Sequence, residues 1–137
     1  MYITLAVTSN PVSYSVNVFH ADVRRKVEKG QELDGFSHPE LKTEDVQRLI
    51  KRLGLYGYQP VGQQIAGAQM TKPVEFVKQV GSCPITVTVF PSEVSFSVPY
   101  WEGSQDAIFE ALQDASELSD SESLALHNPQ LNAWSDG

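Results

Sequence analysis

The sequence predicts an α+β fold in which two hairpins and a short C-terminal strand form an antiparallel sheet, with helices packed on one face. Three observations support this prediction. Segments of alternating polar and apolar residues occur in two pairs, and each pair is joined by a short turn. Two amphipathic helical segments follow the paired segments. Strands joined by hairpins pair antiparallel, and in such folds the helices gather on one side of the sheet.

The composition indicates one globular domain. The chain has 137 residues, of which 41% are hydrophobic and 20% charged, and a domain of this size buries about two-thirds of its unfolded surface. We expect one domain over residues 1–127, with a turn and a frayed tail over 128–137. No apolar run reaches the ~20 residues that a membrane-spanning helix needs. Without a basic, apolar leader segment, the protein is expected to be cytoplasmic.

The first elements are predicted from alternation and turn residues. Tyr2–Thr8 and Ser13–His20 both alternate, and Asn10-Pro11 between them marks a turn, so we expect an N-terminal hairpin. Residues 22–40 carry a basic cluster at Arg24–Lys26 and several Gly and Pro residues, which predict a loop or a short irregular excursion.

The first helix is predicted over Glu44–Leu53. Thr43 is a suitable N-cap, acidic residues occupy the first turn, and Gly54 follows the last apolar residue. The apolar positions recur at helical spacing and define one face: Val46, Leu49, Ile50 and Leu53. Beyond it, residues 59–71 are poorly determined, and Lys72–Val80 is predicted to form a short helix with Pro73 in its first turn.

The second hairpin is the clearest β signal in the chain. Pro84–Phe90 and Val94–Val98 alternate around the turn at Pro91-Ser92. The residues predicted to face the core are Ile85, Val87, Val89, Val94, Phe96 and Val98. Next, Ser104 is predicted to cap a second helix over Gln105–Ser116, whose apolar stripe is Ile108, Ala111, Leu112 and Ala115. Leu124–Leu126 is predicted as a short edge strand, followed by a turn at Asn128-Pro129.

Charge is divided unevenly along the chain. Residues 1–78 carry ten Lys and Arg against eight Asp and Glu, a net charge of +2. Residues 79–137 carry nine Asp and Glu and no Lys or Arg, a net charge of −9. Such asymmetry attracts positively charged partners. The overall net charge of −7 disfavours nucleic acid as a partner, because phosphate binding requires a basic surface.

Part of this negative charge falls on the second helix. Asp106, Glu110 and Asp114 are spaced i, i+4, i+8 and are expected to stack on the side away from the apolar stripe, with Glu117 one turn further on. Like charges at i, i+4 cost roughly 0.2–0.5 kcal/mol per pair, and no Lys or Arg is interleaved. The stripe is either a solvated face that aids solubility or a patch for a basic partner. A ladder on a helix surface lacks the pocket that catalytic carboxylates need.

Tyr100, Trp101 and Glu102 lie between the second hairpin and this helix. Trp and Tyr are enriched at the centres of protein interfaces, so these residues are candidates for partner binding. Alternatively, the two aromatic rings pack under the start of the helix as a lid on the core.

Catalytic and metal-ligating patterns are not found. His20 and Asp22 lack a third clustered ligand, and His38 and His127 are distant in sequence. The single cysteine, Cys83, excludes a disulfide framework and a zinc cage, and it is expected to be a reduced structural thiol. No Gly-rich phosphate loop is present. We therefore expect no enzymatic activity, metal or cofactor.

Two segments resemble a known group. Val94–Ile108, a strand that runs through Pro99-Tyr100-Trp101 into a capped helix, and Leu124–Gln130, a short strand that ends in a turn, resemble the C-terminal part of small bacterial immunity proteins of polymorphic or contact-dependent toxin systems. Many of these carry an aspartate-proline-glutamine turn, where this chain has Asn128 in place of the aspartate.

The resemblance implies a non-enzymatic inhibitor that binds a cognate toxin domain in the cytosol of the producing cell. Acidic residues at 102, 106, 110, 114 and 117 would meet a basic, possibly nuclease, toxin, with Tyr100 and Trp101 as apolar anchors. Electrostatic steering favours such a pairing. Two alternatives stay open: a phage-encoded nucleic-acid mimic that inhibits a DNA-binding enzyme, and a small-ligand or enzymatic α+β domain.

Overall fold

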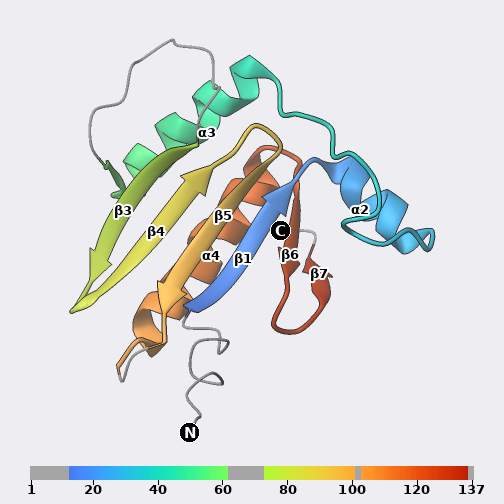
Figure 1. The fold of residues 1–137 in the computed structure, drawn as a ribbon. Helices are drawn as coiled ribbons and strands as arrows, with labels where there is room; N and C mark the ends of the chain where they lie inside the picture. The colour runs from blue at the N-terminus through green and yellow to red at the C-terminus, as the bar shows by residue number, and fades with distance from the viewer. Residues whose placement is uncertain (1–12, 62–72, 101–102, 136–137) are drawn as a thin grey trace, which may run out of the picture.

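The computed structural model describes residues 13–61, 73–100 and 103–135 (Figure 1). The predicted strand Tyr2–Thr8, and with it the predicted N-terminal hairpin, lies outside these residues. In chain order the elements are β1 (Ser13–Phe19), α2 (Ala21–Glu28), α3 (Thr43–Leu55), β2 (Gln59–Pro60), β3 (Val74–Val80), β4 (Cys83–Val89), β5 (Glu93–Pro99), α4 (Gln105–Ser121), β6 (Ala125–Asn128) and β7 (Ala133–Ser135).

The strands form one antiparallel sheet in the order β2-β3-β4-β5-β1-β6-β7 (Figure 1). The predicted α+β class is therefore confirmed. The hairpin of β4 and β5 is also confirmed, with Val87 opposite Phe96 and Val89 opposite Val94. β1 pairs with β5 along its whole length and with β6 on its other edge. The first described strand thus lies inside the sheet, between strands that come much later in the chain.

One face of the sheet, here called the inner face, forms the core. Side chains alternate across a strand, and all six residues predicted to face inward on β4 and β5 are at most 1% exposed, as are Val16 and Val18 of β1. α3 and α4 contribute their apolar side chains to the same core cluster. In Figure 1 α4 runs behind the strands, against this face.

α4 is longer than predicted and is rotated about its axis. It extends to Ser121 rather than Ser116. Its buried stripe is Ala107, Ala111, Ala115 and Leu118, whereas Ile108 and Leu112 are only partly buried at its flank. Helix packing distance depends on the side chains at the contact, so small alanines let α4 lie close to the sheet. The rotation brings Asp114 to the edge of the buried side.

Of the two predicted N-cap residues, Thr43 is wrong and Ser104 occupies the predicted position. Thr43 is the first residue of α3, and the N-cap position before it is Lys42, which makes no side-chain cap hydrogen bond. Ser104 does occupy the N-cap position of α4, but it makes no cap hydrogen bond either. Ser104 is nevertheless buried.

The C-terminus of α3 has the geometry of a Schellman motif. The amide of Tyr58 donates to the carbonyl of Leu53 at 2.9 Å, and the amide of Gly57 donates to that of Gly54 at 3.1 Å. Gly57 has φ +103°, the left-handed conformation that this motif requires. Gly57, and not Gly54 as predicted, therefore ends the helix, and it turns the buried Tyr58 back onto Leu53.

The predicted helix over Lys72–Val80 is wrong, because residues 74–80 form strand β3. Val74, Phe76 and Val80 alternate toward the core as a strand requires. Lys78 occupies the remaining inward position and interrupts the apolar alternation. A charged residue at an inward position hides a strand from a pattern-based prediction.

The irregular excursion predicted over residues 22–40 begins instead with helix α2. His20 precedes the helix, and its Nδ1 accepts a hydrogen bond from the amide of Asp22 at 3.1 Å. Histidine is not among the preferred capping residues, and Val23 is the one buried residue of α2. Neither the capping residue nor the apolar periodicity of the sequence therefore predicts this helix.

The C-terminal segment is more ordered than the frayed end that the sequence predicts. β6 pairs with β1 on one side and with β7 on the other, so it is not an edge strand. β7 pairs with β6, with Trp134 opposite His127.

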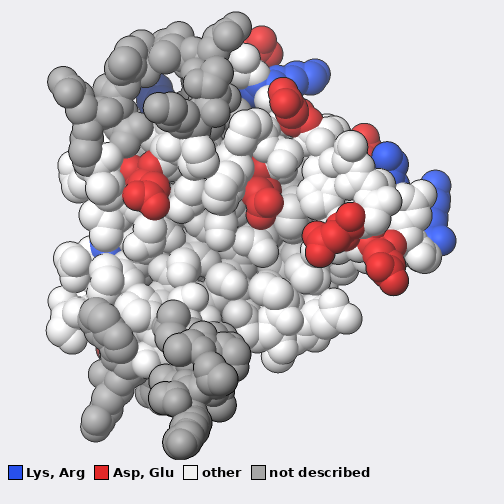
Figure 2. Space-filling model, viewed as in Figure 1, with Lys and Arg blue, Asp and Glu red and all other residues white. Residues whose placement is uncertain are grey.

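The outer face of the sheet is polar along its centre. Thr86 and Thr88 lie opposite Ser97 and Ser95, and few charged side chains appear over the strands on this side (Figure 2). Toward β6 an aromatic cluster replaces the hydroxyl groups. The Phe19 ring lies 5.3 Å from that of His38 and 6.0 Å from that of Trp134.

Among the described helices, none combines the length and the apolar character of a membrane-spanning segment.

We predict opposite effects for alanine at the two glycines that end α3. Gly57→Ala should lower the free energy of unfolding by about 1 kcal/mol or more, because φ +103° strains a residue with a Cβ. Gly54→Ala is the matched control. A Cβ at Gly54 meets no atom within 4 Å, so the helix propensity of alanine should raise stability by about 0.5–1 kcal/mol. Urea unfolding measures both, and equal effects at the two sites would contradict the assignment of Gly57 as the helix end.

Candidate functional site

The inward-facing ammonium of Lys78 joins β3 to α4 and to the end of α3. Lys78 Nζ donates to Glu110 Oε2 at 2.6 Å, to Asp114 Oδ2 at 2.8 Å and to the carbonyl of Tyr56 at 2.9 Å. These three acceptors match the three protons of an ammonium group. Asp114 Oδ2 also accepts from the hydroxyl of Tyr58 at 2.9 Å. The flank of α4 is thereby fastened to β3 and to the end of α3.

These contacts shift the protonation of both donors. Burial alone would lower the pKa of Lys78, but its hydrogen bonds and charge attraction to Asp114 and Glu110 outweigh burial and raise the pKa. Burial, together with the charge of Asp114 and the hydrogen bond to it, raises the pKa of Tyr58. Both groups therefore stay protonated and keep donating at neutral pH.

The expectation of an unrelieved acidic stripe on α4 is corrected by this cluster. Glu110 and Asp114 do not stand free on a helix surface, because Lys78, which lies 32 and 36 positions earlier in the chain, forms an ion pair with each of them. The Asp114 side chain is only 13% exposed. The rotation of α4 explains the difference, since it turns this flank toward β3 and α3. Asp106 and Glu117 lie outside the cluster.

A second acidic residue of the C-terminal half is also paired with the N-terminal half. Glu122, at the C-cap of α4, accepts from Arg48 Nε at 2.9 Å and from Arg52 Nε at 3.0 Å. Its side chain is 4% exposed. Burial alone would raise the pKa of Glu122, but the hydrogen bonds from Arg52 and Arg48 outweigh burial and lower it. This clamp fixes the end of α4 against α3.

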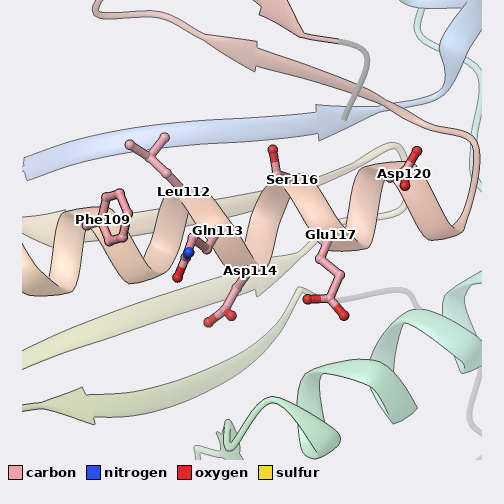
Figure 3. Close-up of a pocket in the computed structure, with 7 residues that line it drawn as sticks. All are labelled: Phe109, Leu112, Gln113, Asp114, Ser116, Glu117 and Asp120. Atoms are coloured by element: carbon pink, nitrogen blue, oxygen red, sulfur yellow. The ribbon is translucent and has the colours of Figure 1, made fainter.

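The outward side of α4 is different in character. Phe109 is 64% exposed, and it lines an open hollow of about 570 Å³ with polar and acidic residues of the same helix. We define the α4 surface by its exposed residues Asp106, Phe109, Gln113, Glu117 and Asp120. Within the described part of the chain, no ion pair is formed by Asp106, Glu117 or Asp120. Figure 3 shows Asp114 and Glu117 on one side of the helix and Asp120 on the other.

The position of Glu117 and Asp120 is unfavourable for the helix itself. Both lie in the C-terminal part of α4, whose last turn contains no basic residue. The C-terminus of a helix carries partial negative charge, so anions there are destabilising and cations stabilising, by roughly 0.3–1 kcal/mol each. These two carboxylates violate a local stability rule with no compensating contact among the described residues. Such violations are expected at functional positions.

A smaller hollow of about 230 Å³ lies beside α4, over β6 and β7. It adjoins the first hollow, since Leu112 and Ser116 line both. Leu126 and Ala133 line it from the sheet, and Leu131, which is 70% exposed, lines it from the turn before β7. The α4 surface therefore borders an apolar groove.

The other predicted binding residues lie toward the start of α4. Tyr100 is about half exposed, and its ring packs edge-on against Tyr14 at 6.1 Å. Trp101 and Glu102 lie outside the described residues. Asp106 is exposed in the first turn of α4, about 20 Å along the axis from Asp120 at 1.5 Å per residue. The predicted site is thus spread along the whole helix.

The turn that carries the family resemblance is a structural clamp. Asn128 Oδ1 accepts from the amide of Gln130 at 3.1 Å, and Asn128 Nδ2 donates to the hydroxyl of Tyr14 at 2.7 Å. The side chain of Gln130 then pairs with the backbone of Ser15, accepting from its amide at 2.9 Å and donating to its carbonyl at 2.6 Å. A side-chain amide thus extends the pairing of β1 beyond β6.

Features typical of a catalytic centre are not found among the described residues. No group of three or more His, Cys, Asp or Glu side chains there could hold a metal ion. Cys83 is buried, and its Sγ lies 3.9 Å from the carbonyl oxygen of Pro99. His127 is buried beside Trp134, with its Nδ1 unpartnered.

Comparison of the chain with protein-family models, with curated proteins and with solved structures finds no match.

Sequence reasoning missed three residues of this region. Phe109 stands opposite the apolar stripe of its helix, and a large aromatic residue at such a position is a signal that the sequence does contain. Asp120 falls beyond the predicted end of α4 at Ser116, so it was not placed on the helix. Leu131 falls in the predicted frayed tail, and only the pairing of β7 brings it beside α4.

We predict that Lys78→Met destabilises the protein by about 2–3 kcal/mol, because it leaves Asp114 without its cation in a mostly buried position. Lys51→Met is the control. Lys51 is exposed on α3, and the change should stay within about 0.5 kcal/mol. Urea unfolding measures both variants. A loss for Lys78→Met no larger than that of the control would show that Lys78 does not hold α4.

We predict that Glu122→Gln flattens the acid limb of the stability curve. The pKa of Glu122 is lower in the folded state, so the carboxylate contributes stability above its unfolded pKa, near 4.5. That contribution is lost as the pH falls through the folded value. Wild type should therefore exceed the variant by about 1–2 kcal/mol at pH 7, and the difference should shrink below pH ~4.5. Urea unfolding from pH 7 to pH 3 tests this, and a constant difference would contradict it.

Proposed function

We propose that this protein is a non-enzymatic inhibitor that binds a basic protein through the α4 surface, as an immunity protein binds its toxin. One observation carries the proposal. An exposed Phe109 shares the open hollow on α4 with two carboxylates, Glu117 and Asp120, that have no ion-pair partner among the described residues, on a helix whose other flank is ion-paired to Lys78. In this proposal the protein acts in the cytosol of the producing cell and uses no cofactor.

The physical properties of the α4 surface suit such a partner. A buried Phe removes about 150–250 Å² from water and is a typical interface anchor. Carboxylates around an anchor attract a basic partner, raise its association rate and oppose acidic competitors. Because the net charge of the whole chain is −7, the long-range field acts in the same direction as the local one.

The same observations weigh against the alternatives. A face selected only for solubility does not require an exposed Phe109 in the same hollow as its carboxylates. A mimic of nucleic acid needs anions spread over a long surface at phosphate-like spacing, but Glu110, Asp114 and Glu122 are committed to internal ion pairs. A small-ligand site needs an enclosed cavity with convergent polar groups, whereas the hollow on α4 is open along the helix (Figure 3).

We predict that Glu117→Lys/Asp120→Lys separates stability from binding. Replacing anions by cations at the C-terminal end of α4 should leave the free energy of unfolding unchanged or raise it by about 0.3–1 kcal/mol. Association with the partner should slow on the order of tenfold to a hundredfold at low salt and lose its salt dependence. Glu32→Lys/Glu75→Lys is the control, because both residues are exposed elsewhere and the change in net charge is identical.

The measurement uses the full chain as bait in extract of its source cells, with both double variants in parallel. A protein retained by wild type and by the control, but lost by the α4 variant, is purified for stopped-flow association. Its gene is then expressed with and without this protein. The proposal requires that growth arrest is relieved by wild type and by the control, and far less by the α4 variant. Equal protection by all three, or by none, would refute it.

A further inference from the structure

Among the described residues, the apolar groove beside α4 lies where the helical layer over the inner face is incomplete. α3 and α4 belong to the core cluster that covers the inner face of β3, β4, β5 and β1. At the β6–β7 end, α2 contacts β6 but contributes no residue to that cluster. Neighbouring helices pack with their axes 8–10 Å apart, so a helix placed next to α4 on this side would lie over β6 and β7. The 230 Å³ hollow is at that position.

We propose that this groove is the seat of an amphipathic basic helix of the partner, which lies alongside α4 and completes the helical layer. The inference rests on the proposed function, because it names the segment of the inhibited protein that is recognised. Leu112 and Leu126 form its apolar floor, and Leu131 its far wall. Ser116 and Ala133 are small and leave room for side chains of an incoming helix.

Charge determines which helix fits. Leu112, Ser116 and Asp120 point to the same side of α4 in Figure 3, so the unpaired carboxylate of Asp120 lies one helical turn beyond the groove residue Ser116. Phe109 lines the adjoining hollow on the same helix. A Lys or Arg of the incoming helix would meet Asp120 at the C-terminal end of α4, where a cation is also favoured by the helix dipole. Its apolar face would meet Phe109, Leu112 and Leu131.

A second copy of this chain is a poor occupant of the same groove. Residues 79–137, which include α4, β6 and β7, contain no Lys or Arg. Two copies meeting through this region would place carboxylates against carboxylates without a cation between them. A copy that meets the groove through this region supplies no complementary cation, whereas a basic partner does.

The direct test uses a synthetic peptide of 18 residues, with Leu at i, i+3, i+4 and i+7 positions and Lys on its other faces, titrated into the ¹⁵N-labelled full chain. We expect saturable amide shifts centred on Leu112, Ser116, Leu126 and Ala133, with the peptide becoming helical by circular dichroism. A peptide with Glu in place of each Lys should bind at least about tenfold more weakly, since charge reversal turns attraction at Asp120 into repulsion.

Two variants place the peptide in the groove. Ala133→Arg fills it and should weaken binding by about tenfold or more, and Leu131→Ser, at a residue exposed enough to change without unfolding, should weaken it severalfold. Gln79→Arg is the matched control, exposed on β3, and should bind as wild type does. The proposal would be overturned if the peptide did not bind, if the Glu peptide bound equally well, or if the amide shifts mapped to β4 and β5 alone. It would also be overturned if the peptide bound in an extended form along β7, or if the chain dimerised through α4 as its concentration rose.

The captured partner separates failure of the groove from failure of the inhibitor function. Ala133→Arg should abolish protection from the partner's toxicity as Glu117→Lys/Asp120→Lys does. If Ala133→Arg protects as well as wild type while the charge variant does not, the protein is an inhibitor but the groove is not the seat. If a helical segment of the partner cross-links to a cysteine placed at Ser116, and not to one placed at Gln79, the seat is supported.

Discussion

The ammonium of Lys78 is the contact on which the orientation of α4 depends. It lies at an inward position of β3, where an unpaired charge would be costly, and its three protons are accepted by Glu110, Asp114 and the carbonyl of Tyr56. The alanine stripe of α4 sets how closely the helix lies against the sheet, and Lys78 sets which flank of the helix faces β3. Glu122 is paired with two arginines of α3 and fixes the C-terminal end of α4.

This arrangement changes the meaning of the charge distribution along the chain. In the sequence, the C-terminal half has no cation of its own, but in the fold Lys78, Arg48 and Arg52 of the first half form ion pairs with three of its carboxylates. What is left unpaired among the described residues of α4 is confined to its outward side, where Phe109 is also exposed. An acidic helix is thus divided into a flank that holds the protein together and a surface available to a partner. The apolar groove over β6 and β7 adjoins that surface, so anchor, charge and groove are contiguous.

Local patterns predicted the elements whose stability is local. The hairpin of β4 and β5 and the body of α3 follow from alternation and helical spacing, and their buried residues agree. β3 was not predicted because Lys78 occupies a core-facing position, where its charge is balanced by Glu110 and Asp114, far along the chain. The rotation of α4 was not predicted because Ile108 and Leu112 are more hydrophobic than the alanines that contact the sheet. Both errors affected the predicted site. The ion pairs of Glu110 and Asp114 could not be predicted without β3, and the exposure of Phe109 could not be predicted without the rotation of α4.

A double-mutant cycle between Lys78 and Asp114, measured by urea unfolding, tests most directly whether α4 is divided in this way. The reference cycle couples Lys78 to Asp120, which points away from Asp114 (Figure 3). With Lys78→Met, Asp114→Asn and Asp120→Asn, the account predicts a coupling energy of about 1–3 kcal/mol for Lys78 with Asp114, and a value within about 0.3 kcal/mol of zero for Lys78 with Asp120. Equal coupling in the two cycles would contradict it, because the two carboxylates would then belong to the same surface.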